Sequence, residues 1–175
     1  MRTNLSSQIS LNRVSTKYYK PENAVERSVL TRFEKVPTDI YESVDEGVCH
    51  IANEIAGKIQ LRQREGKFLV IGAGTGASLR PLYAELVRKH KDEGLSFRNV
   101  VVFNLYEYYP LAPESAGSSY SQLIDLFVGQ VDIDKQNVFT IDGSIPQESV
   151  FEYCRLYEQR LQTFGGMDIA LMGIG

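Results

Sequence analysis

The sequence has no tryptophan, only two cysteines, only two histidines and no long apolar run. Cys49 and Cys154 lie far apart without metal-ligand spacing, which predicts reduced thiols in a cytoplasmic protein. No stretch approaches the roughly 18 apolar residues that a membrane span needs. His50 and His90 have no sequence partners that indicate a metal site or a catalytic triad, so structural roles are expected for both. These absences argue against a disulfide-stabilised protein, a membrane span and a metal centre.

The sequence also lacks a large excess of positive or negative charge. The net charge is −3, which gives no general attraction to nucleic acid or to an anionic membrane. The apolar share of 43% and the charged share of 23% are ordinary for a water-soluble globular protein. A length of 175 residues suits one domain with a sizeable core.

What the sequence does contain is an alternation of apolar runs and amphipathic segments. Ser43 followed by Glu46 has the capping-box pattern of a helix start. Strands are predicted at 67–71, 100–104, 138–141 and 168–172, and helices at 43–64, 78–90, 118–128 and 146–164. This order predicts the α/β class, with a doubly wound, mostly parallel Rossmann-like sheet and helices on both faces.

The two ends of the sequence differ from this pattern. Residues 1–37 are predicted to form an N-terminal extension, with a polar arm followed by a short helix at 21–35. A short strand is predicted at 39–41, and the α/β domain is assigned to residues 38–175. The apolar run at 169–175 is typical of a buried strand that needs further elements to cover it. We therefore expect an incomplete domain that either forms a homo-oligomer or belongs to a larger protein.

A glycine-rich segment, Gly72 to Ser78, follows the strand predicted at 67–71 and precedes a helix. Glycines permit a tight turn with exposed N–H groups, and the start of the helix adds partial positive charge. Thr75 and Ser78 add hydroxyl groups, so the segment is a candidate phosphate site. The spacing is not GxGxxG and lacks the Gly-Lys-Ser/Thr of a nucleotide-binding P-loop. The alternative is a turn that only lets the strand and helix pack closely.

A polar segment follows the next strand, at the same expected edge of the sheet. Asn104, Tyr106, Glu107 and Tyr108 are plausible substrate ligands at that edge. The alternative is that the tyrosines are packing aromatics and Glu107 is a solvated or capping acid.

The segment from Ser96 to Tyr108, together with the glycine turn before it, resembles the glucosamine-6-phosphate deaminase family, which carries an F-N-x-D-E-Y motif at the same distance. The resemblance covers about residues 38–175. It implies a Rossmann-like fold and conversion of glucosamine 6-phosphate to fructose 6-phosphate and ammonia, without a metal or pyridoxal cofactor. The ligand implied is a small phosphosugar. By position, the phosphate loop falls on Gly74, Thr75, Gly76, Ala77 and Ser78, and the F-N-x-D-E-Y motif starts at Phe103 and Asn104.

The sequence departs from the family at the catalytic position. Tyr106 stands where the family has its catalytic aspartate, and Glu107 matches the glutamate of the motif. A phenol titrates near pH 10 and an aspartic acid near pH 4, so a base that is ionised at neutral pH is lost. Glu107 is no automatic substitute, because neighbours on an extended segment point to opposite sides. The family's catalytic histidine and further basic residues follow the stretch that ends here at Gly175.

Three functions therefore stay open. In the first, the full-length protein is a deaminase in which Glu107 or Tyr106 takes part in an altered proton transfer, and the 175-residue piece is inactive. In the second, the domain binds a phosphosugar as a sensor or partner module without deamination. In the third, it is a 6-phosphogluconolactonase-like hydrolase or an isomerase on the same architecture.

Overall fold

The computed structural model describes residues 23–32 and 38–173, which fall into two compact units divided between Glu42 and Ser43. In the first unit, helix α1 (Ala24–Thr31) begins after Asn23, whose Oδ1 accepts the Glu26 N–H at 2.9 Å. Both predicted ends of this helix lie outside the described residues. The predicted strand at 39–41 is wrong, since residues 38–41 have no regular structure.

The second unit is built on a parallel sheet whose described strands lie in the order β3-β2-β1-β4. The strands are β1 (Leu69–Ala73), β2 (Val100–Asn104), β3 (Val138–Phe139) and β4 (Ile169–Leu171). The register pairs Leu69 with Val100 and Ala73 with Asn104, so β1 and β2 end at the same level. Every residue of these two central strands is buried, which agrees with their continuous apolar sequences.

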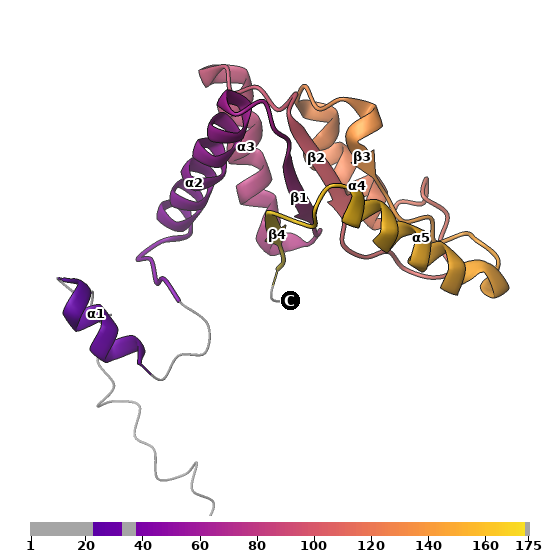
Figure 1. The fold of residues 1–175 in the computed structure, drawn as a ribbon, viewed down its shortest axis with the longest axis horizontal. Coiled ribbons are helices and arrows are strands. Elements are labelled where there is room, and N and C mark those ends of the chain that lie inside the picture. The colour runs from indigo at the N-terminus through magenta and orange to yellow at the C-terminus, as the bar shows by residue number, and fades with distance from the viewer. Residues whose placement is uncertain (1–22, 33–37, 174–175) are drawn as a thin grey trace, which may run out of the picture. The chain divides into compact units, whose positions relative to one another are not determined.

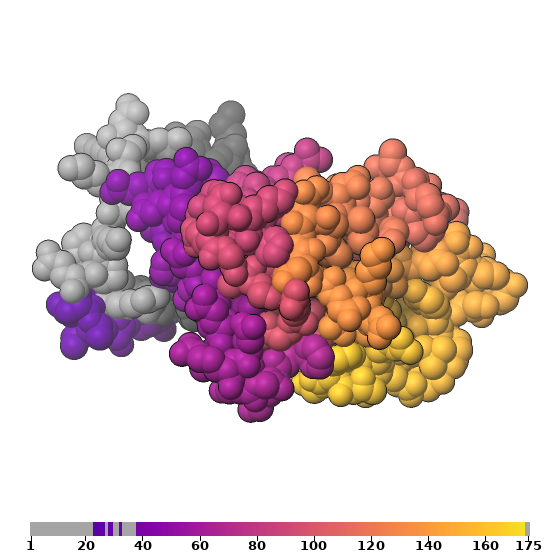
Figure 2. All heavy atoms as spheres, turned by 90° about the horizontal axis from the view of Figure 1, so that it is seen from above, coloured from indigo at the N-terminus to yellow at the C-terminus, as the bar shows by residue number. Residues whose placement is uncertain are grey.

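Helices cover both faces of the sheet, which confirms the predicted fold class (Figure 1). One face packs against α2 (Val44–Arg64), α3 (Arg80–Glu93) and α4 (Ser119–Leu126) in the larger core. The other packs against α5 (Val150–Thr163) through Tyr157 and Leu161. Short 3₁₀ turns η3 to η6 lie at 77–79, 128–130, 135–137 and 147–149. In Figure 2, α2 and α3 (purple to magenta) and α5 (yellow) lie at opposite ends of this unit.

Helix α2 begins as its sequence predicts, because the Ser43 hydroxyl accepts the Glu46 N–H at 3.1 Å. Helix α5 differs from the helices of the larger core, since none of its residues is fully buried. Phe151 and Leu156 are exposed on this helix, among mostly charged and polar exposed residues. No helix in the described ranges is long and apolar enough to cross a bilayer.

Candidate functional site

The glycine turn lies between β1 and α3, in the order that the sequence predicts. Strand β1 runs through Gly72 to Ala73, so the turn itself starts at Gly74, two residues later than expected. Gly76 has φ of +137°, a conformation that L side chains rarely adopt. The 3₁₀ turn η3 (Ala77–Leu79) follows and leads into α3 at Arg80. The local sequence thus forms a sharp turn whose centre is the Gly74–Thr75–Gly76 segment.

Two glycines here are closely packed, Gly72 against the ends of side chains and Gly74 against the backbone of β4. A Cβ atom on Gly72 would lie 2.7 Å from Leu105 Cδ2, so this residue serves the interior of the sheet. A Cβ atom on Gly74 would lie 2.8 Å from the Leu171 carbonyl oxygen and 3.3 Å from Cε1 of Tyr106. The Gly74 N–H donates to that same Leu171 oxygen at 2.9 Å. The turn is therefore held against the end of β4 and beneath the Tyr106 ring.

A buried polar cluster lies beside the turn, at the carboxyl end of β2. The Thr75 and Ser119 hydroxyl oxygens are 2.7 Å apart, and the Ser119 hydroxyl also lies 3.5 Å from Asn104 Oδ1. Asn104 and Ser119 are fully buried, and Thr75 nearly so. Asn104 Nδ2 has no hydrogen-bond partner among the described residues. A buried amide N–H without an acceptor is costly, so it marks a place where a ligand oxygen is expected.

The structure brings Thr75 and Asn104 together, as the prediction of a shared sheet edge requires. Ser119, which lies near the start of the helix predicted at 118–128, joins them. It arrives from α4, because its helix begins against the same edge. Periodicity within the sequence carries no signal for this long-range contact.

Tyr106 lies over the turn and forms hydrogen bonds with the backbone of Thr75. The Tyr106 hydroxyl accepts the Thr75 N–H at 2.8 Å and donates to the Thr75 carbonyl oxygen. The Tyr83 hydroxyl of α3 donates to the Gly74 carbonyl oxygen at 2.6 Å. Burial, with a smaller contribution from Tyr106, raises the pKa of Tyr83 above its ordinary value. Two phenols thus fix the backbone of the turn.

Glu107 points to a different partner, the N-terminus of α4. Its carboxylate accepts the Ser118 hydroxyl at 2.7 Å and the backbone N–H groups of Ser119 and Tyr120, each at 2.9 Å. It also accepts the neighbouring Tyr108 N–H at 2.9 Å. Desolvation raises the pKa of Glu107, but these hydrogen bonds outweigh it and hold the pKa below its ordinary value. Of the roles considered from the sequence, these contacts favour a capping acid.

The other predicted residues lie at the rim of the turn. Ala77 and Ser78 are exposed on η3. A Cβ atom on Gly173 would overlap the Ser78 hydroxyl, so the chain after β4 passes beside Ser78.

His90 Nδ1 lies 2.7 Å from the Leu95 carbonyl oxygen, in agreement with a structural role. Within residues 23–32 and 38–173, no cluster of side chains could hold a metal ion.

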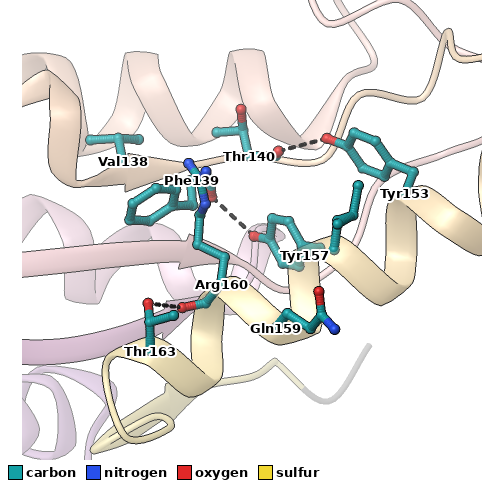
Figure 3. A pocket seen from close by; sticks show the side chains of 9 residues that line it. Val138, Phe139, Thr140, Tyr153, Tyr157, Gln159, Arg160 and Thr163 are labelled. Carbon is teal, nitrogen blue, oxygen red and sulfur yellow. Dashed lines mark hydrogen bonds between the residues drawn. The ribbon is translucent and has the colours of Figure 1, made fainter.

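A separate open groove of about 600 Å³ lies between β3 and α5 (Figure 3). The hydroxyls of Tyr153 and Tyr157 donate to the Thr140 and Phe139 carbonyl oxygens there, at 3.1 and 3.0 Å. Arg160 lies over the Phe139 ring, 5.3 Å from its centre. None of the predicted site residues lines this groove.

Parallel strands, helices on both faces and a glycine turn beside buried polar groups define a doubly wound α/β protein with its candidate site at the strand ends. Residues 42–175 match the family model described as glucosamine-6-phosphate isomerases/6-phosphogluconolactonase. The chain belongs to this family.

Several relatives are similar to most of the chain. It is 60% identical over all 175 residues to a glucosamine-6-phosphate deaminase-like protein of Bacteroides thetaiotaomicron, of which it covers 26%. It is 32% identical over 136 residues, or 78% of its length, to glucosamine-6-phosphate isomerase of Candida albicans, of which it covers 53%. The chain thus spans between about a quarter and a half of the length of these relatives.

Solved structures agree with the fold. A monomeric glucosamine-6-phosphate deaminase is similar with a TM-score of 0.71 and 30% identity, over 77% of this chain and 54% of that one. The 6-phosphogluconolactonase of Thermotoga maritima has a TM-score of 0.59 at 22% identity, over 73% of this chain and 56% of that one. The second likeness concerns the fold alone.

Proposed function

We propose that the turn from Gly74 to Ser78, with Asn104 and Ser119, forms the phosphate-binding part of a hexosamine-phosphate site. Glucosamine 6-phosphate is the proposed ligand of the full-length protein, in keeping with the family and with the names of the relatives. The observation that carries the proposal is the buried Asn104 amide, whose Nδ2 finds no partner in the described part of the chain. It lies next to the Thr75 and Ser119 hydroxyls, which offer further donors to an anion.

Binding is favoured over deamination as the role of these residues. Deamination with ketose formation needs a base that can accept a proton from the sugar carbon. The Glu107 carboxylate already accepts four hydrogen bonds, and the Tyr106 hydroxyl is bonded to both the N–H and the carbonyl oxygen of Thr75. Neither group is therefore free to act as that base in this arrangement.

Deaminase activity of the full-length protein is the second candidate, and it is supported by family membership. It would require Tyr106 or Glu107 to leave its present partners, or a base outside the described residues. The third candidate is hydrolysis of 6-phosphogluconolactone, which the other half of the family description motivates. A cytoplasmic location and self-association remain predictions.

The test uses the full-length protein and isothermal titration calorimetry. Glucosamine 6-phosphate should bind, and unphosphorylated glucosamine should not. Asn104→Leu should weaken binding at least about tenfold, because it removes a buried donor that has no acceptor among the described residues and that the ligand phosphate would use. Asn99→Leu is the matched control: this asparagine stands at the other end of β2, where its Nδ2 donates to the Ile59 carbonyl oxygen at 3.1 Å.

Equal effects of the two substitutions on affinity would remove the support for a site at Asn104. Parallel assays for ammonia, fructose 6-phosphate and 6-phosphogluconate separate the three functions. Binding without turnover supports the phosphosugar-binding role, and turnover of either substrate replaces it with the corresponding enzyme.

A further inference from the structure

The Tyr106 side chain occupies the face of the turn where a phosphate oxygen would have to approach Thr75. Its hydroxyl accepts the Thr75 N–H at 2.8 Å, and the same hydroxyl donates to the Thr75 carbonyl oxygen. The ring covers Gly74, with Cε1 3.3 Å from the position that a Cβ atom would take. Tyr106 thereby makes the contacts that an oxygen-rich ligand would make with this peptide.

The Gly74 N–H, which precedes the Thr75 N–H in the turn, also has an acceptor within the protein. The Gly74 N–H is bonded to the Leu171 carbonyl oxygen of β4, a contact that belongs to the fold. The Thr75 N–H is different, because its acceptor is the end of a side chain that is 39% exposed. A side chain with solvent on one side can rotate away at little steric cost, whereas β4 cannot move without breaking the sheet.

We propose that Tyr106 is a built-in competitor for the phosphate turn: its phenol and a phosphate oxygen of the ligand exclude each other at the Thr75 N–H. This inference rests on the proposed function, since it concerns the same site. The competition lowers the affinity for any anion that enters the turn. It selects ligands that also replace the hydrogen bond to the Thr75 carbonyl oxygen, as a sugar hydroxyl or amino group does and a simple anion such as sulfate does not.

The experiment compares wild type, Tyr106→Phe and Tyr109→Phe in the full-length protein. Phenylalanine keeps the ring and removes only the competing hydroxyl. We expect Tyr106→Phe to bind glucosamine 6-phosphate about two to twelve times more tightly, the range for one released neutral hydrogen bond. Tyr109 is half exposed and its hydroxyl has no partner among residues 23–32 and 38–173, so Tyr109→Phe should bind as wild type does.

Hydrogen exchange of the ligand-free proteins supplies an independent measurement. The segment 72–79 should exchange faster in Tyr106→Phe than in wild type, because the Thr75 N–H has lost its acceptor. Unchanged exchange in this segment would overturn the proposal, as would affinity that is unchanged or weaker in Tyr106→Phe.

The two proposals fail in different ways. If wild type binds glucosamine 6-phosphate and Tyr106→Phe binds it no better, only the competition is refuted and the phosphosugar site stands. If neither protein binds it, the proposed function fails and the competition fails with it.

Discussion

Replacing Glu107 with alanine is expected to destabilise the domain by detaching the start of α4. The carboxylate accepts the N–H groups of Ser119 and Tyr120, which have no acceptor within the helix at its first turn. It also accepts the Ser118 hydroxyl and the Tyr108 N–H. Alanine leaves all four donors without this partner.

The expected loss of unfolding free energy follows from those contacts. A hydrogen bond to a charged group contributes about 1.5–3 kcal/mol, and a negative charge at a helix N-terminus adds about 0.3–1 kcal/mol. The four contacts are not additive, and water replaces some of them at this partly exposed group. We therefore expect Glu107→Ala to lower the free energy of unfolding by about 2–4 kcal/mol, measured by urea denaturation. Glu114→Ala, in the same loop and exposed, should change it by less than about 0.5 kcal/mol.

The difference between wild type and Glu107→Ala should also depend on pH. The hydrogen bonds lower the pKa of Glu107 in the folded state, so the folded protein holds the carboxylate ionised where the unfolded chain protonates it. The stabilisation is therefore complete above the unfolded pKa of about 4.3 and is lost as the pH falls through the lowered folded pKa. A loss below about 1 kcal/mol at pH 7, or equal losses for the Glu107 and Glu114 variants, would refute the capping role.

Two further substitutions test how the turn is held. Gly74→Ala should destabilise the domain by about 1–3 kcal/mol in thermal unfolding, because its Cβ would lie 2.8 Å from the Leu171 carbonyl oxygen. The control is Gly57→Ala, in open space on α2, which should stabilise the domain by about 0.5–1 kcal/mol. If both changes have the same sign, the close approach at Gly74 is refuted. Tyr83→Phe should cost about 1–3 kcal/mol, because the Gly74 carbonyl oxygen loses its buried donor. The pKa of Tyr83 is raised in the folded protein, so the stability that its hydroxyl contributes is complete below the unfolded pKa of about 10 and declines as the pH rises further. A difference in unfolding free energy between wild type and Tyr83→Phe that grows above pH 10 would contradict this.

The fold could be predicted where the sequence is locally decisive. Val100 to Asn104 is a continuous apolar run ending in a polar residue, and β2 has these bounds. Strand β3 is shorter than predicted: the Thr140 carbonyl oxygen accepts the Tyr153 hydroxyl and lies outside the sheet ladder. The predicted strand at 39–41 did not form, because strand formation depends on a neighbour that composition cannot reveal.

In the candidate site, the shared edge of two predicted residues could be predicted, but the hydrogen bonds around them could not. Parallel strand ends brought Thr75 and Asn104 together as expected. The capping of α4 by Glu107 spans 11 to 13 positions along the chain and has no helical or strand period, so no local pattern could reveal it. The hydrogen bonds between Tyr106 and the Thr75 peptide likewise depend on a tertiary contact across 31 positions.

We propose above that the turn from Gly74 to Ser78 receives the phosphate of a hexosamine phosphate. The most direct measurement is hydrogen exchange of the full-length protein with glucosamine 6-phosphate and with unphosphorylated glucosamine. Only the phosphorylated sugar should slow exchange in residues 72–79 and in the first turn of α4. Protection confined to the groove between β3 and α5, or no protection of residues 72–79 at a saturating concentration, would contradict it.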